Sequence, residues 1–449
     1  MFRRILIANR GEVAARIHRT CQRMGIEVVA VASSADREHL WLQDADEVVT
    51  LGPARASNSY LDASALIEVA RAKGCSAVHP GWGFLAENAY FASRCEAAGI
   101  TFVGPSPQAM QRMGDKALAR ETMSALGMPI IPGTKRVLPD IDAARRAADA
   151  VGYPVLLKAV AGGGGRGMRA VSNVKEIQSA WSEATSEAMS SFGDGRMYLE
   201  KLIVGGRHIE VQVIADGYGD VVVLGERECS LQRRHQKVLE EAPSVGLPDA
   251  ERARILPLVA EVVAKAGYVN AGTVEMLLDA AGNLYFMEMN TRLQVEHCVT
   301  EQVTGIDLVE WQLRVAANER LPLNQGQIAI RGHAIECRIN AEDPDDGFRP
   351  SPGVVNVLDF GRGEGIRIDT HLRTGDRIPP NYDSMVAKVI AHGTDRAQAI
   401  SRMKRALADT RIEGVKTNIS LHQRILQWDA FTSGNYDTKS LESDLMGAE

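Results

Sequence analysis

The first hundred residues alternate between short apolar runs and stretches whose apolar residues recur every three or four positions. Residues 5–8 are a predicted strand, and residues 12–24 follow with Val13, Ile17 and Cys21 on one helical face. The same pattern predicts strands over 28–31 and 77–79 and helices over 63–73 and 87–98. This alternation predicts a parallel, doubly wound α/β sheet at the N-terminus.

The pattern changes twice further along the chain. A helical pattern over 115–126 leads into the Pro/Gly-rich segment "GMPIIPG", and a second alternating unit follows, with strands over 155–159, 168–171 and 197–201 and a helix over 174–189. From about residue 204 consecutive strands and hairpins predict a larger α+β unit. We therefore expect three parts, 1–114, 115–203 and 204–449. The last twenty or so residues are polar and are expected to be weakly ordered.

The stretch "FMEMNTRLQVEHCVTE", residues 286–301, begins with strict alternation. One row is largely apolar, and the other is largely polar. Such a period of two predicts a strand that runs as far as Glu296. The apolar row is Met287, Met289, Thr291, Leu293 and Val295, and the other row is Phe286, Glu288, Asn290, Arg292, Gln294 and Glu296.

Just upstream, "AAGN" separates two strand-like runs and predicts a hairpin. A turn centred between Ala281 and Gly282 places Asp279 opposite Leu284, Leu277 opposite Phe286 and Glu275 opposite Glu288. Two glutamates with Cβ atoms about 5 Å apart repel each other unless a cation lies between them. With the amide oxygen of Asn290 they form a ligand set that suits Mg²⁺ or Mn²⁺. An edge strand with solvated acids is the alternative, and spacing alone does not separate the two.

The segment "VLLKAVAGGGGRGMRAV" places a glycine-rich loop between two strands. It lacks the GK[ST] sequence and the following helix of a Walker A site. A glycine-rich hairpin can still close over phosphates, because its backbone N–H groups are unobstructed. Lys158, at the end of the first strand, is placed to reach a phosphate. A flexible surface hairpin is the alternative, but so dense a run of glycines favours the phosphate lid.

Composition narrows the classes of protein. The chain has 449 residues, 45% of them hydrophobic, and a net charge of -6, which indicates several domains and no nucleic-acid partner or anionic membrane surface. The six cysteines are scattered, so we expect neither a disulfide framework nor a zinc cluster. The segment "MFRRILIANR" is too short in apolar residues for a signal peptide, so we expect a first strand there, and no apolar run is long enough to span a membrane. The default expectation is a soluble, cytoplasmic protein.

These pieces together resemble biotin carboxylase, a family of the ATP-grasp superfamily, in segments that span nearly the whole chain in family order. No single motif is as specific as the joint match. The matching segments are "ANRGEVAARI", "HPGWGFLAEN", "FVGPSP", "GDK", "KAVAGGGGRGMR", "EKLI", "RHIEVQV", "ERECSLQRRHQKVLEEAPS", "FMEMNTRLQVEH", "ECRINAEDP", "FRPSPG" and "NYDSMVAKVI".

The resemblance implies an ATP-grasp fold with a mobile glycine-rich lid after the parallel-sheet domain, then a C-terminal α+β domain. It also implies roles for individual residues. ATP would be held by Lys116, Lys158, Glu200, Lys201, Ile203, His208, Gln232, His235 and Leu277, with Gly163, Gly164 and Gly165 closing over the phosphates. Glu275, Glu288 and Asn290 would bind Mg²⁺ or Mn²⁺, with two ions plausible, and the two glutamates would thereby also contact ATP. Bicarbonate would be held by Lys237, Arg292, Gln294, Val295 and Glu296.

The implied reaction is ATP-dependent carboxylation of biotin through carboxyphosphate. Glu296 would be the base, ionised beside Arg292, and Arg338 would stabilise the enolate oxygen of biotin, with Lys237 and Arg292 also catalytic. The family usually has tyrosine at Trp82, near the biotin site, and the larger indole without a hydroxyl puts biotin affinity or carrier preference in question.

The chain shows no AMKM-type biotin attachment site, and "RMKR", residues 402–405, lies in a helical pattern. The resemblance therefore implies a separate biotin carboxyl carrier protein, separate carboxyltransferase subunits and a homodimer, as in a bacterial acetyl-CoA carboxylase of fatty acid synthesis. Another acyl-CoA or pyruvate could be the final acceptor. Two other hypotheses are an ATP-grasp ligase that joins an acyl phosphate to an amine and a non-catalytic nucleotide-binding subunit. The bicarbonate residues and Arg338 argue against the first, and the intact set of acids argues against the second.

Overall fold

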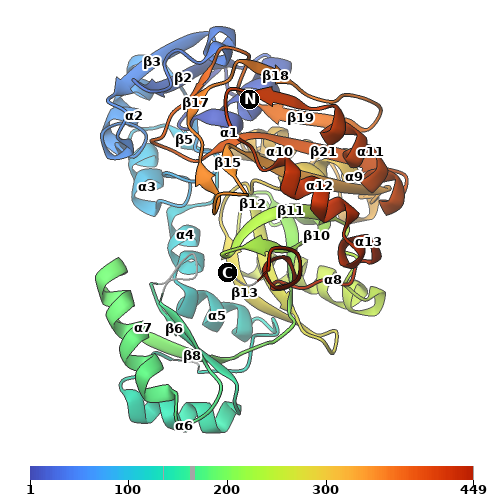
Figure 1. Cartoon of the computed structure of the whole chain (residues 1–449). Helices are drawn as coiled ribbons and strands as arrows, with labels where there is room; N and C mark the ends of the chain where they lie inside the picture. Colours follow the sequence, from blue (N-terminus) through green and yellow to red (C-terminus); the bar gives the residue numbers. More distant parts are fainter. Residues whose placement is uncertain (135, 162–166, 448–449) are drawn as a thin grey trace.

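A computed structural model describes residues 1–134, 136–161 and 167–447. Figure 1 shows a main body that contains both ends of the chain and a smaller lobe, with α6, α7, β6 and β8, that projects from it. The main body is built on two large sheets, with three small two-stranded sheets beside them, and the lobe has a three-stranded sheet of its own. The architecture is mixed α/β, as the sequence predicts.

The N-terminal sheet is parallel, with strand order β3-β2-β1-β4-β5. Ile5 and Ile7 pack against α1 and α10 on one face, whereas Leu6 packs toward α2 and α3 on the other, so both faces are covered. The strands are β1 (Arg4–Ile7), β2 (Glu27–Ser33), β3 (Glu47–Gly52), β4 (Ala77–His79) and β5 (Thr101–Phe102). The helices are α1 (Gly11–Arg23), α2 (Ala63–Ala72), α3 (Ala89–Ala97) and α10 (Leu308–Ala316).

The projecting lobe has its own small core beneath an antiparallel sheet of order β7-β6-β8. Its elements are α6 (Ile141–Val151), β6 (Val155–Ala159), β7 (Met168–Val171), α7 (Ile177–Phe192) and β8 (Met197–Lys201). Two helices, α4 (Pro107–Gly114) and α5 (Lys116–Ala125), connect this lobe to the N-terminal sheet. Residues 162–166, between β6 and β7 in the sequence, lie outside the described residues.

An antiparallel sheet of eight strands forms the centre of the main body, in the order β13-β12-β9-β10-β11-β14-β21-β19. Its strands are β9 (Arg207–Ala215), β10 (Val221–Arg233), β11 (Gln236–Ala242), β12 (Asn270–Leu278), β13 (Leu284–Asn290), β14 (His333–Asn340), β19 (Ile366–Thr370) and β21 (Met385–Gly393). Helices α8 (Asp249–Lys265), α9 (His297–Thr304) and α11 (Arg396–Asp409) contact these strands. One continuous sheet therefore joins residues 207 to 393.

Smaller elements complete the C-terminal third. They are β15 (Glu342–Asp343), β16 (Arg349–Pro350), β17 (Gly353–Val354), β18 (Val357–Asp359), β20 (Arg377–Ile378), β22 (Arg411–Glu413), α12 (Ile419–Gln427), α13 (Asp429–Ser433) and a π-helical turn, Leu441–Leu445. Phe431, Tyr436 and Leu441 are buried in the adjoining core. The expectation of a weakly ordered end is therefore wrong for the described residues up to 447, because three apolar side chains anchor this polar segment. The described helices include none long and apolar enough to cross a membrane.

The strand predicted over 286–296 is shorter than its pattern suggests. β13 ends at Asn290, and Glu296 is the residue that precedes α9. Glu275 does lie opposite Glu288, but a bulge after Glu275 moves the rest of the register. Met276, not Leu277, pairs with Phe286, and Leu278, not Asp279, pairs with Leu284. The sequence prediction missed the extra residue that a bulge inserts.

Candidate active site

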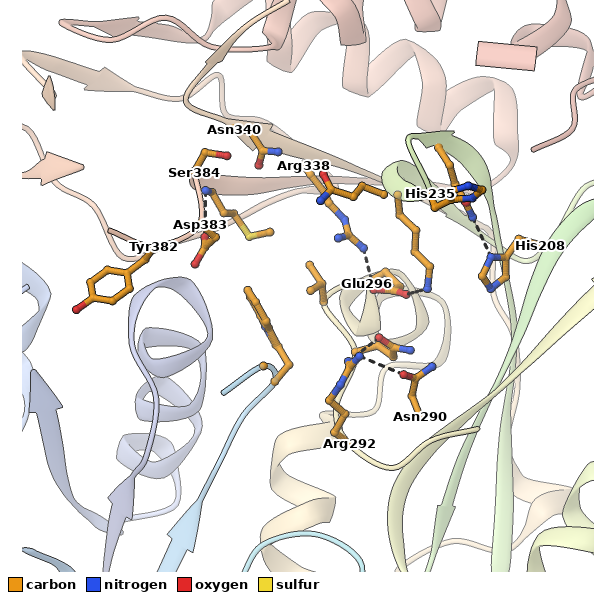
Figure 2. A pocket seen from close by; sticks show the side chains of 18 of the residues that line it. His208, His235, Asn290, Arg292, Glu296, Arg338, Asn340, Tyr382, Asp383 and Ser384 are labelled. Carbon is orange, nitrogen blue, oxygen red and sulfur yellow. Dashed lines mark hydrogen bonds and ion pairs between the residues drawn. The ribbon is translucent and has the colours of Figure 1, made fainter. Parts of the chain in front are cut away.

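A cavity of about 800 Å³ is lined by residues of the eight-stranded sheet, of the projecting lobe, of the loop after β4 and of the segment before β21. Most of the residues predicted from the sequence line it, and Figure 2 shows many of them converging from different elements. The predicted residues in its lining are Trp82, Lys116, Lys158, His208, Gln232, His235, Lys237, Glu275, Glu288, Asn290, Arg292, Gln294, Val295, Glu296 and Arg338.

A cluster of charges surrounds Glu296, a buried residue of the cavity lining. Its carboxylate accepts a hydrogen bond of 2.7 Å from Lys237 Nζ and one of 3.0 Å from Arg338 Nη2. Lys237 also contacts Glu210, and it lies 3.1 Å from Glu275 Oε1. Arg338 in turn donates to Glu240 over 2.6 Å. Glu296 is thus held by cations from β11 and β14.

These neighbours decide the protonation of the cluster. Burial and the charge of Glu210 would raise the pKa of Glu296, but Lys237 and Arg338 lower it below its ordinary value. Burial alone would lower the pKa of Lys237, but Glu210, Glu275 and Glu296 raise it. Glu296 is therefore an ionised carboxylate at neutral pH, able to accept a proton.

Arg292 lies within electrostatic range of Glu296, and Glu296 helps to raise the pKa of its guanidinium, but its hydrogen bonds go to other residues. Its Nε donates to Glu87 Oε2 over 2.8 Å, and its other nitrogens donate to Gln294 Oε1 and Asn290 Oδ1 over 2.8 and 3.1 Å. The contacts that keep Glu296 ionised come from Lys237 and Arg338 instead. Glu87, which the sequence interpretation left without a role, also accepts from the backbone of Thr291 over 3.1 Å and so fixes the start of this loop.

The predicted metal ligands line the same cavity, next to the charge cluster around Glu296. Glu275 and Glu288 are directly opposed across β12 and β13, and Asn290 follows on the same strand. Glu288 Oε2 forms an ion pair with Lys116 Nζ at 3.0 Å, and Glu275 Oε2 lies 3.3 Å from His208 Nε2. Within the described residues, Nδ2 of Asn290 is buried without a hydrogen-bond partner. The carboxylate and amide oxygens fit Mg²⁺ or Mn²⁺. In this structure Lys116 lies beside the carboxylate of Glu288, and Lys237 and His208 lie beside that of Glu275.

The side of the cavity next to the projecting lobe carries lysines and a histidine. Lys158 donates to Glu200 over 2.7 Å, and Arg120, on the buried face of α5, pairs with the same carboxylate. His208 Nδ1 is bonded to Gln232 over 2.8 Å. The sequence analysis did not identify Arg120 as a site residue. Its position one helical turn after Lys116 in a predicted helix is the signal that could have identified it.

Four residues predicted to hold ATP are outside the cavity lining. Glu200 is buried behind Lys158, and the Lys201 ammonium donates to the carbonyls of Gly152 and Tyr153 over 2.8 and 2.9 Å. Ile203 and Leu277 both lie against Gly206. The Gly163, Gly164 and Gly165 prediction falls outside the described residues. The structure therefore brings the phosphate-binding and bicarbonate-binding candidates together more directly than the adenine-binding ones.

The C-terminal third contributes a wall that the sequence interpretation left without roles. Tyr382, Asp383 and Ser384 precede β21, and Asn340 ends β14 (Figure 2). Trp82, partly buried, lines the same cavity and also a smaller adjoining one together with Tyr382 and Asp383. In the sequence, the segment "NYDSM" could be recognised as part of the site only through the family resemblance, because its residue spacing matches no general motif.

The arrangement suits transfer of a phosphoryl group to a small anion. Lysines, a candidate metal site and an ionised carboxylate line one cavity, and phosphoryl transfer depends on such positioning and charge neutralisation.

Comparison with known proteins agrees along the whole chain. Residues 1–110 match the family described as biotin carboxylase, N-terminal domain, and residues 336–443 match the biotin carboxylase C-terminal domain. Residues 115–324 match the ATP binding domain of the carbamoyl-phosphate synthase L chain. Biotin carboxylase of Nostoc sp. is 50% identical over 441 residues, 98% of this chain and 99% of that protein. Biotin carboxylase 1 of Bacillus subtilis is 48% identical, with both chains covered completely.

Solved structures give the same result. A biotin carboxylase–ATP complex from Campylobacter jejuni has a TM-score of 0.95 at 46% identity, with 98% of each chain covered. The biotin carboxylase domain dimer of 2-oxoglutarate carboxylase from Hydrogenobacter thermophilus has a TM-score of 0.94 at 45% identity, covering 100% of this chain and 99% of that one. That dimer was solved with MgADP, ADP and bicarbonate.

Proposed function

The chain belongs to the biotin carboxylase family, and on that premise we propose that it uses ATP and bicarbonate to carboxylate biotin, with Glu296 as the base. The observation that carries this assignment is the contact of Glu296 with both Lys237 and Arg338, at 2.7 and 3.0 Å, inside one cavity with the candidate nucleotide and metal residues. A base for bicarbonate and a cation for the biotin enolate then share one location.

In the first step an oxygen of bicarbonate attacks the γ-phosphorus of ATP, and the bond from that phosphorus to the β–γ bridging oxygen breaks. Glu296 accepts the bicarbonate proton, and ADP leaves. Lys116 and Lys158 neutralise phosphate charge, and Lys237, Arg292 and Gln294 hold bicarbonate. Mg²⁺ or Mn²⁺ bound by Glu275, Glu288 and Asn290 would add charge neutralisation at the phosphates.

In the second step carboxyphosphate breaks into CO2 and phosphate. The phosphate takes the proton from the ureido nitrogen of biotin, and that nitrogen attacks CO2. Arg338 stabilises the negative oxygen of the enolate as it forms. Its position is set by two carboxylates, Glu240 and Glu296, which orient the guanidinium toward the cavity.

The finer assignments rest on the resemblance and on the packing. We place the boundaries at 1–114, 115–203 and 204–449, because the projecting lobe has a separate core and one sheet continues from β9 to β21. The partners are a biotin carboxyl carrier protein, carboxyltransferase subunits and a second copy of this chain, in the cytoplasm. Full-length similarity to proteins named biotin carboxylase supports this, and acetyl-CoA is the proposed final acceptor.

The substitution Glu296→Gln tests the base. Carboxylation of free biotin is expected to fall by about a hundredfold or more, because the amide cannot accept the bicarbonate proton. Binding of ATP, measured by fluorescence titration with a nucleotide analogue, is expected to change little. Normal turnover of Glu296→Gln with free biotin would show that another group is the base.

A further inference from the structure

Lys388 is a lysine with no exposed surface in the middle of β21. Burying an ammonium group is costly unless specific partners compensate it. Lys388 lies directly opposite Arg338 in the β14–β21 ladder, and opposed residues of antiparallel strands share one face of the sheet. That face is the one that carries Arg338 toward Glu296.

The ammonium of Lys388 reaches the loop that precedes the proposed base. Its Nζ donates to the carbonyl oxygen of Val295 over 2.7 Å and lies 3.1 Å from Cys298 Sγ. Its carboxylate partner Glu12, in the first turn of α1, is further away at 3.3 Å. The shortest contact of this buried charge is therefore with the backbone immediately before Glu296.

The same loop is fixed at the neighbouring residue by a different group. The ring Nδ1 of His297 lies 2.7 Å from the carbonyl oxygen of Gln294. The two successive backbone carbonyls of Gln294 and Val295 are thus each fixed by a buried side chain, His297 and Lys388. The side chains of Gln294, Val295 and Glu296 line the cavity. A charged donor makes the stronger hydrogen bond, so Lys388 contributes more to the orientation of this loop than a neutral group would.

We propose that Lys388 is a positioning residue for bicarbonate: by holding the Val295 carbonyl it sets the direction in which Val295 and Glu296 face the substrate. Glu12 is the carboxylate in ion-pair contact with the ammonium, Glu336 and Asp369 add to the compensation of its charge, and Glu12 has no direct part in the proposed reaction. This inference rests on the proposed function of Glu296. It also links three distant segments, α1, the loop before α9 and β21, at one buried point.

The test measures KM for bicarbonate and for ATP separately in purified full-length variants. In Lys388→Met the KM for bicarbonate is expected to rise about tenfold to a hundredfold, the effect of losing one charge-assisted hydrogen bond. The KM for ATP should stay within about twofold, because the lysines near the projecting lobe are untouched. Since Lys388→Met leaves Glu12 buried without its cation, thermal stability is expected to fall.

Two further variants separate positioning from folding. Glu12→Gln keeps the bond from Lys388 to Val295, so its KM for bicarbonate should remain within about twofold of the native value. The double variant Glu12→Gln/Lys388→Met removes both charges, so it should recover thermal stability relative to Lys388→Met while KM for bicarbonate stays high.

Three results would overturn the inference. They are a native KM for bicarbonate in Lys388→Met, recovery of that KM together with stability in the double variant, and a parallel rise of both KM values in step with lost stability. Failure of the native chain to release ADP in response to bicarbonate would instead contradict the proposed function itself.

Discussion

Glu240 and Glu241 are neighbours on β11, equally buried, and they face opposite sides of the same sheet. Burial raises the pKa of Glu240 to about 7, with Arg338 opposing the rise. Burial acts on Glu241 too, but His333 and Arg396 lower its pKa to about 2. The two carboxyls are buried to the same extent, so their pKa values differ because their partners differ.

The partners show what each face does. Glu241 is bonded by His333 and Arg396, both over distances of 2.6 to 2.7 Å, and by Tyr436 from the C-terminal segment. This closed set ties the sheet to the last helices. Glu240 instead shares Arg338 with Glu296 beside the cavity. A buried acid therefore indicates a functional site here only where its partner also lines the cavity, as Arg338 does. Four predictions test this contrast between the two faces of the sheet.

The largest effect is expected at the metal residues on the cavity side. In Glu288→Gln, carboxylation should fall by about a hundredfold or more at low Mg²⁺, because one charged oxygen ligand is lost. Raising the concentration of Mg²⁺ or Mn²⁺ should recover part of the activity, as titration of the initial rate would show. An unchanged metal dependence would mean that Glu288 serves only as the partner of Lys116.

On the other face, Glu241→Gln should affect stability and not chemistry. Removing one partner of a buried ion pair leaves Arg396 and His333 uncompensated and is expected to cost about 3–5 kcal/mol in the free energy of unfolding. Urea denaturation measures this loss, and KM values at low temperature serve as the control. A variant with native stability but altered KM for bicarbonate would reverse the roles assigned to the two faces.

The same carboxyl predicts how that stability depends on pH. The folded state lowers the pKa of Glu241 from 4.5 to about 2, so its contribution is complete above about pH 4.5 and is lost as pH falls toward 2. The difference in unfolding free energy between the native chain and Glu241→Gln should therefore be constant near pH 6 and shrink below pH 4.5. A difference that grows on acidification would contradict the ionised state assigned to Glu241.

The smallest effect is expected at Trp82, on the cavity wall. In Trp82→Tyr the ring keeps an apolar face but loses contact area, so KM for free biotin should change by less than about tenfold. The KM for ATP should not change, since the substitution leaves Lys116 and Lys158, the lysines proposed to hold the phosphates, untouched. Steady-state kinetics with each substrate varied in turn would detect a broader role.

The sequence predicts those helices and strands whose hydrophobic pattern fits only one kind of secondary structure. The strands at Arg4–Ile7 and Ala77–His79 and the helix Lys116–Ala125 lie within a residue or two of their predicted bounds. The opposition of Glu275 and Glu288 also follows, because a hairpin brings its two strands into pairing. Resemblance supplied the residues that converge on the cavity.

The misses have physical reasons. Alternation continued past Asn290 although the strand ends there, because a loop that presents polar groups to a substrate can imitate a strand. The bulge after Glu275 leaves no mark in the residue types. Lys388 is the single lysine in a largely apolar strand, and Arg120 is one of three charged residues in α5. Their partners Val295 and Glu200 are distant in sequence. Only the folded chain identifies such pairs.

The most direct test of the account is ADP release by the purified native chain with Mg²⁺ and ATP, measured with and without bicarbonate and free biotin. We expect release to require bicarbonate and to rise when biotin is added, with carboxybiotin formed in the same reaction. ADP release that is indifferent to bicarbonate, or that is unaffected by biotin, would contradict the assignment of this cavity to biotin carboxylation.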